Sequence, residues 1–177
     1  KNLKMASEWI ESEEKQEQFA REKTKKDIYD AMQSLEYEIN TLYSSQGQTP
    51  FTSLGFGLGE GYFEKEIQKA ILKVRIAGLG KEKRTAIFPK LIFVIKEGLN
   101  LKPEDPNYDV KQLALECATQ RMYPDVIMYD TLVKITGSCK TPMGCRSFLP
   151  AWRDENGELV ESVRKNLGVV TLTLPPI

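Results

Sequence analysis

Cys145 is the residue with the greatest capacity for chemistry in this chain. It lies in Pro142–Leu149, which reads Pro-Met-Gly-Cys-Arg-Ser-Phe-Leu. Gly144 permits a sharp bend and leaves room for a group that approaches closely. The spacing predicts a loop with the thiol at its tip, held by apolar neighbours on both sides. Such a thiol can react, but a free cysteine is more often a small buried hydrophobic residue. Residue types alone leave both interpretations open.

The other residue types restrict what this thiol can do. The three cysteines, Cys117, Cys139 and Cys145, contain no C-x-x-C pair, and the chain has no histidine. We therefore expect no metal site and no Cys-His or Ser-His catalysis, which leaves mainly redox or radical chemistry. The spacing places Cys117 on an apolar helix face, as core. Cys139 has two interpretations: it forms a disulfide or redox pair with Cys145, or it is an incidental residue without a role, which is the one we adopt.

Composition indicates a single soluble globular domain. The 177 residues are 41% hydrophobic and 28% charged, enough for a core. Lys plus Arg and Asp plus Glu both number 25, and no basic stripe stands out, so a nucleic-acid partner is not expected. The longest strongly apolar run, Leu91–Ile95, is too short for a membrane span. The absence of a signal peptide and the odd cysteine count favour the cytoplasm.

The elements that position Cys145 follow from hydrophobic periodicity. Apolar spacing of three and four residues predicts helices, and unbroken apolar runs predict buried strands. The predicted helices are Ile28–Leu42, Phe63–Ala77 and Val110–Ala118, with a solvated helix over Lys1–Glu22. The predicted strands are Phe51–Phe56, Ala86–Ile95 and Leu167–Leu174, with Val126–Ile135 ambiguous and a turn at Asn156-Gly157. Alternating helices and strands indicate an α/β fold with a largely parallel sheet.

A glycine series overlaps the first predicted strand and continues beyond it. Gly55, Gly57, Gly59 and Gly61 could form a phosphate-binding loop, but no Lys-Ser/Thr pair follows and the dinucleotide-binding spacing is absent. The alternative, which the sequence favours, is a closely packed strand end before a helix.

Many separate short motifs of the sequence resemble the anaerobic (class III) ribonucleoside-triphosphate reductase family, and they occur in the same order along the chain. The similarity runs from about Lys23 to the last residue. These motifs are Leu35–Leu42, Ser45–Phe51, Thr52–Gly59, Phe88–Leu91, Asp105–Asp109, Arg121–Asp125, Met143–Leu149 and Asn166–Val170.

The resemblance implies part of a ten-stranded α/β barrel of the glycyl-radical enzyme type, with long N-terminal helices. Residues 1–45 would form a helical lead-in, and residues 46–177 the barrel elements with a finger loop. In that family a glycyl radical oxidises the loop cysteine, here Cys145, to a thiyl radical. The thiyl radical removes the 3′-hydrogen of a ribonucleotide, and the 2′-hydroxyl leaves as water. A barrel interior would shield such a radical from water.

The resemblance also implies residues around the substrate. Asn166 matches an asparagine near the ribose hydroxyls, and its amide can both donate and accept. Its alternative role is a turn residue before a strand. Gly144, Arg146 and Ser147 are candidate substrate contacts, although Arg146 and Ser147 could instead satisfy loop backbone. The sequence departs from the family pattern at four positions near the end, namely Val163, Lys165, Thr173 and Pro176.

Both ends of the sequence lie in patterned segments, so we expect an internal piece of a longer enzyme that is inactive alone. The resemblance implies an ATP-cone domain, an early barrel cysteine, a four-cysteine zinc site and the glycyl-radical glycine, none found here. It further implies ATP and dNTP effectors, a radical-SAM activating enzyme and a homodimer. The alternatives are a decayed copy that only packs against a partner, or another glycyl-radical enzyme.

Overall fold

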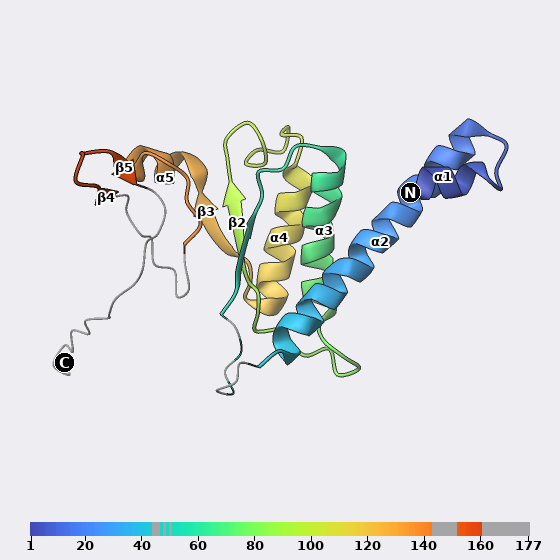
Figure 1. The fold of residues 1–177 in the computed structure, drawn as a ribbon, viewed down its shortest axis with the longest axis horizontal. Coiled ribbons are helices and arrows are strands. Elements are labelled where there is room, and N and C mark those ends of the chain that lie inside the picture. Colours follow the sequence, from blue (N-terminus) through green and yellow to red (C-terminus); the bar gives the residue numbers. More distant parts are fainter. Residues whose placement is uncertain (44–46, 48, 50, 143–151, 161–177) are drawn as a thin grey trace.

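The chain alternates helices and strands around a small parallel sheet (Figure 1). The computed structural model describes residues 1–43, 47, 49, 51–142 and 152–160. The helices are α1 (Asn2–Ser7), α2 (Glu13–Thr41), α3 (Tyr62–Ala77), α4 (Tyr108–Arg121) and α5 (Tyr129–Thr136). The strands are β1 (Ser53–Phe56), β2 (Lys90–Ile95), β3 (Asp125–Met128), β4 (Trp152–Arg153) and β5 (Leu159–Val160). The predicted α/β class is confirmed.

The main sheet has the strand order β1-β2-β3, and both pairings are parallel. β2 is central and is buried from Leu91 to Ile95, as expected for a strand covered on both faces. The two crossover helices, α3 and α4, lie side by side on one side of this sheet (Figure 1). Right-handed crossovers that advance in one direction place successive helices on the same face. The ten-stranded barrel is not visible in the described residues.

The core lies between β2 and these two helices. Phe93 and Ile95 pack with Leu72 of α3 and with Val110 and Cys117 of α4. The predicted apolar face of α4 is therefore confirmed as core. The helix begins after a turn at Asp105–Asn107, where the Asp105 carbonyl accepts a hydrogen bond from the Tyr108 backbone N–H at 3.2 Å.

Cys117 is fully buried, as its spacing predicts, and burial raises the pKa of its thiol to about 11. We expect Cys117 to resist alkylation in the folded protein, because the thiolate is the reactive form. Trypsin cleavage after Lys111 and Arg121 isolates it on its own peptide, so mass spectrometry can follow its labelling. In the unfolded chain the thiol ionises nearer its ordinary value of 9.0. The free energy of unfolding should therefore fall as the pH rises between these values.

Cys117→Ser should cost roughly 1–3 kcal/mol of stability, because it buries a hydroxyl among apolar side chains. Urea unfolding measures this loss. Cys139→Ser is the control and should cost less, since Cys139 is only half-buried. Native-state labelling of Cys117 as fast as that of Cys139 would contradict the assignment to the core.

The N-terminal segment is two helices, whereas a single solvated helix was predicted over Lys1–Glu22. Ser12 precedes Glu13 and Glu14, and acidic residues in a first turn favour a helix that begins there. The Asn2 side-chain amide donates to Thr24 Oγ1 at 2.9 Å, so α1 lies against α2. The solvated character is confirmed, because most of these side chains are exposed.

The helices predicted at Ile28–Leu42 and Phe63–Ala77 are confirmed within α2 and α3, but their apolar faces are only partly buried. Ile71 and Val74 of α3 are buried, whereas Phe63 is 55% exposed and Leu35 of α2 is 41% exposed. The two long helices cross at an angle, and their far ends diverge (Figure 1). Two helices that cross bury only the residues near their point of contact, so the apolar residues farther along each helix remain exposed.

The predicted strand Ala86–Ile95 begins four residues late, at Lys90. Asn40 Oδ1 accepts hydrogen bonds from the backbone N–H groups of Ile87 and Phe88, each at 3.1 Å. A side chain therefore satisfies these groups instead of a neighbouring strand. The strand predicted at Phe51–Phe56 is likewise shorter, since β1 begins at Ser53.

Two further predictions are settled by the described residues and one is not. The ambiguous segment Val126–Ile135 divides into β3 and α5. The turn at Asn156-Gly157 is confirmed between β4 and β5, where Gly157 has φ +80°. The strand predicted at Leu167–Leu174 lies outside the described residues.

The glycine series packs closely at the end of β1. Gly57 has φ +124°, and a Cβ there would lie 2.8 Å from the backbone nitrogen of Val94. The Gly59 carbonyl accepts hydrogen bonds from the side-chain amides of Asn107 at 2.7 Å and Gln68 at 3.0 Å. These contacts support the strand-end interpretation. Across the described part of the chain, no helix combines the length and the apolar character that a membrane crossing needs.

Candidate functional site

The residues that the sequence predicts for the site lie outside the described residues. These are Gly144, Cys145, Arg146, Ser147 and Asn166. Their roles stay predictions. The structure does describe Ser138–Pro142, which leads directly into this segment and is called the stem below.

The stem begins where α5 ends. Gly137 has φ +78° and ends the helix in the left-handed conformation, which glycine adopts without strain. The Thr136 hydroxyl lies 2.8 Å from the Ser138 carbonyl oxygen and 2.9 Å from that of Leu132. At the other end of the stem Pro142 is buried. The stem is therefore anchored at both ends.

Cys139 lies within the stem and is half-buried. Burial raises the pKa of its thiol above the ordinary value. The thiol is therefore protonated near neutral pH.

The stem contacts the sheet on the face opposite the helices. Phe93 and Ile95 point into the helical core, so Ile92 and Val94, which alternate with them, point to the other face. Gly55 of β1 pairs with Ile92 and faces the same way. A Cβ built on Gly55 would lie 2.8 Å from Thr141 Oγ1 and 2.9 Å from Thr141 Cγ2. Thr141 therefore sits directly against β1.

This opposite face is apolar and buried at its centre. Ile92 is 3% exposed and Val94 is 6% exposed. The register of β2 with β3 adds Asp125 and Ile127 to the same face. The buried, apolar side chains of Ile92 and Val94 suit a reactive sulfur that must be kept from stray hydrogen donors.

Asn100 ties the carboxyl ends of two strands together. It is fully buried, and its amide donates to the carbonyls of Gly57 at 2.9 Å and Val94 at 3.1 Å. Its Oδ1 accepts from the Lys96 backbone N–H at 2.9 Å. At the next strand end the Glu97 N–H donates to the Asp130 carboxylate at 3.0 Å. These bonds hold the sheet edge in one geometry.

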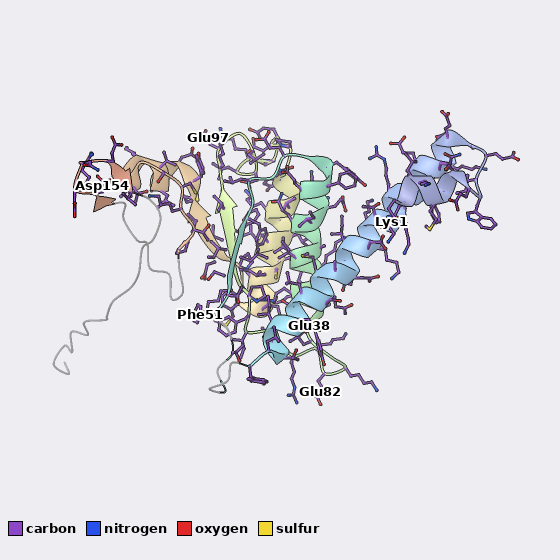
Figure 2. All side chains as sticks on the ribbon, viewed as in Figure 1. Lys1, Glu38, Phe51, Glu82, Glu97 and Asp154 are labelled. Carbon is purple, nitrogen blue, oxygen red and sulfur yellow. The ribbon has the colours of Figure 1, made fainter. Side chains whose placement is uncertain are left out.

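A buried ion pair holds the amino ends of the strands. The Arg75 guanidinium of α3 donates through Nε to the Glu36 carboxylate of α2, and both residues are at most 4% exposed. Arg75 Nη2 donates to the Pro89 carbonyl at 2.6 Å, and the guanidinium lies 5.7 Å from the Tyr123 ring centroid. The cluster joins α2, α3 and the segments that enter β2 and β3. Figure 2 labels Glu38, which lies on α2 two residues after Glu36.

The Glu36 carboxyl has an unusual protonation equilibrium. Burial raises its pKa above the ordinary value, and the attraction of Arg75 opposes the shift without cancelling it. The unfolded carboxyl loses its proton at a lower pH than the folded one. Between the pKa of the unfolded chain and that of the folded protein, the contribution of Glu36 to the free energy of unfolding falls as the pH rises. The pair therefore fixes geometry more than it stabilises the fold.

Sequence reasoning missed both the contact of Gly55 with Thr141 and the pair of Glu36 with Arg75. Glu36 lies among the apolar residues of a predicted helix. This position could have indicated in the sequence that its charge is buried. Nothing in the sequence pairs Gly55 with Thr141, since the contact spans 86 residues of chain. Among the described residues, no group of three or more His, Cys, Asp or Glu side chains could hold a metal ion.

Comparison with known proteins identifies what the chain resembles. Residues 5–177 match the family model described as anaerobic ribonucleoside-triphosphate reductase. A Salmonella typhimurium protein of that name is 59% identical over 177 residues, which is 100% of this chain and 25% of the relative. An Escherichia coli K12 protein of the same name is 58% identical with the same coverage.

A relative in bacteriophage T4, also named anaerobic ribonucleoside-triphosphate reductase, is 58% identical over 161 residues. That alignment covers 90% of this chain and 27% of the phage protein. The chain therefore spans about a quarter of the length of the curated relatives it matches.

Proposed function

Because the chain belongs to the anaerobic ribonucleoside-triphosphate reductase family, we propose that it forms the part of the catalytic barrel that carries the reactive cysteine. The observation that supports this most directly is the position of the stem. Thr141 lies on the sheet face opposite α3 and α4, and Cys145 follows four residues later. In an α/β barrel the helices are outside, so the opposite face lines the interior.

The three parallel strands form one arc of that barrel in this proposal. Both crossover helices lie on one side, as in sheets that curl in a single direction (Figure 1). Within the described residues β1 and β3 each pair with one neighbour only. We assign their outer edges to further strands of a ten-stranded barrel.

The proposed substrate is a ribonucleoside triphosphate, and Cys145 is the reacting group. A glycyl radical held in another segment of the full-length protein would supply the oxidising equivalent, and the Cys145 thiol would give up its hydrogen atom to it. The Cys145 sulfur would then take the 3′-hydrogen of the ribose, and the 2′-hydroxyl would take up a proton and leave as water. An external two-electron reductant would complete the reduction, and the hydrogen would return from the sulfur to C3′. The buried side chains of Ile92 and Val94 suit this chemistry, since neither of them can titrate or form a hydrogen bond. A fixed sulfur close to one hydrogen provides the orientation that the step requires.

The chain's other residues bind and orient the substrate. Asn166 holds the ribose hydroxyls, because an amide can donate and accept without ionising. Gly144 leaves room for the substrate beside the loop, and Arg146 and Ser147 contact its polar groups. We assign ATP and dNTP effector binding, the structural zinc and the contact with a radical-SAM activating enzyme to other segments of a homodimeric, cytoplasmic protein.

A chimera tests this proposal. The 177 residues replace the matching quarter of the Escherichia coli relative, and the product is activated and assayed anaerobically for deoxyribonucleotide formation. We expect turnover of ribonucleoside triphosphates, because the segment then has the rest of the enzyme. The unmodified relative and the isolated chain are the controls, and the isolated chain should be inactive.

The two alternatives predict different outcomes. A segment that serves only for packing would give a folded but inactive chimera. A different glycyl-radical enzyme would give a chimera that forms a radical but makes no deoxyribonucleotide. Either result would overturn the assignment.

A further inference from the structure

We propose that Gly55 and Thr141 form a positioning contact that sets where the cysteine loop begins. The inference rests on the proposed function, since it gives the contact a role in placing the Cys145 sulfur. Gly55 and Thr141 are positioning residues, because neither is assigned a contact with the substrate.

Gly55 is required for space and not for backbone conformation. It lies in the extended strand β1, and its φ is outside the left-handed region that favours glycine. A Cβ at this position would lie 2.8 Å from Thr141 Oγ1 and 2.9 Å from Thr141 Cγ2. Real Cβ atoms essentially never approach other heavy atoms so closely. Any other residue at position 55 therefore forces the stem away from β1.

Rotation of the Thr141 side chain does not relieve this clash. Both of its branches face Gly55, so its hydrogen on Cβ points away. Side chains occupy three staggered positions, and every rotamer keeps at least one heavy branch toward β1. The backbone must move instead, by about half an ångström to restore ordinary contact distances. Removal of both branches would relieve the clash, because the Thr141 Cβ is 3.5 Å away.

A shift of the stem reaches the reactive sulfur. Pro142 is buried and follows Thr141 directly, and Cys145 is three residues further on. Four residues of extended chain span at most about 14 Å, so whatever fixes Thr141 restricts where Cys145 can lie. A displacement of about 1 Å at a reacting group can lower a rate roughly 100-fold.

The test is a double-mutant cycle in the chimera, with Gly55→Ala, Thr141→Ala and the double variant. We expect Gly55→Ala to lower kcat about 10-fold or more with KM little changed, because the reacting atom moves while substrate contacts remain. In the Thr141→Ala background the same substitution should cost much less. Gly61→Ala is the matched control, since the atoms nearest to a Cβ there belong to the flexible Glu64 side chain, the closest at 3.1 Å.

A second measurement does not depend on turnover. Trypsin cleaves after Lys134, Lys140 and Arg146, so Cys139 and Cys145 fall on separate peptides. Iodoacetamide labelling followed by mass spectrometry should show an altered Cys145 rate in Gly55→Ala, restored in the double variant, with the Cys117 rate unchanged.

The outcomes separate the two proposals. If the parent chimera makes no deoxyribonucleotide but Gly55→Ala changes Cys145 labelling as expected, the proposed function fails and the positioning contact stands. Unchanged kcat and unchanged Cys145 labelling in Gly55→Ala would overturn the contact. Equal loss in Gly55→Ala and in the double variant would also overturn it, because the clash would not be the cause.

Discussion

Cys145→Ser in the chimera should abolish deoxyribonucleotide formation while leaving folding and nucleotide binding nearly unchanged. Serine is almost isosteric with cysteine, so the structural cost is small. The O–H bond is much stronger than the S–H bond, so the serine hydroxyl cannot give up its hydrogen atom to a glycyl radical. Anaerobic turnover, nucleotide affinity and the melting temperature together test this result.

Cys117→Ser is the comparison for that result and should behave in the opposite way. Cys117 lies in the core between β2 and α4, on the sheet face opposite the stem, so turnover should persist at temperatures where the variant stays folded. Its melting temperature should fall. Measurable deoxyribonucleotide formation by Cys145→Ser would sink the assignment of the reactive sulfur, whatever the overall similarity.

Glu36→Ala should be the most destabilising single change among the described residues that we consider. It removes the carboxylate and leaves the Arg75 guanidinium fully buried without its counter-charge. Breaking one side of a buried pair typically costs about 3–5 kcal/mol. The melting temperature and the urea midpoint of the chimera would both fall. Joint replacement of Glu36 and Arg75 by apolar residues of similar volume should recover most of the loss.

Glu82→Gln provides the matched control for the buried pair. Glu82 forms an ion pair with Arg84, whose side chains are 69% and 77% exposed. Exposed pairs contribute about 0–1 kcal/mol, so this variant should unfold almost as the parent does. Equal losses of stability in Glu36→Ala and Glu82→Gln would contradict the burial of Arg75 away from water that the structure indicates.

The sequence by itself determined the elements whose hydrophobic pattern is periodic or continuous. The helices at Ile28–Leu42, Phe63–Ala77 and Val110–Ala118 lie within α2, α3 and α4, and Leu91–Ile95 is a buried strand. These patterns are local, because spacing along the chain decides which face a side chain takes. The sequence also identified Cys117 as a core residue, and the order of its short motifs identified the family.

Only the tertiary structure decided how these elements meet. The start of β2 at Lys90 depends on Asn40, which lies 47 and 48 residues before the two backbone groups that it satisfies. The pairing of Glu36 with Arg75 and the contact of Gly55 with Thr141 join segments that no periodicity connects. Long-range contacts of single side chains leave no repeating pattern in a sequence. The face on which the stem of the cysteine loop lies was therefore decided by packing, through a glycine whose missing Cβ leaves the space that Thr141 fills.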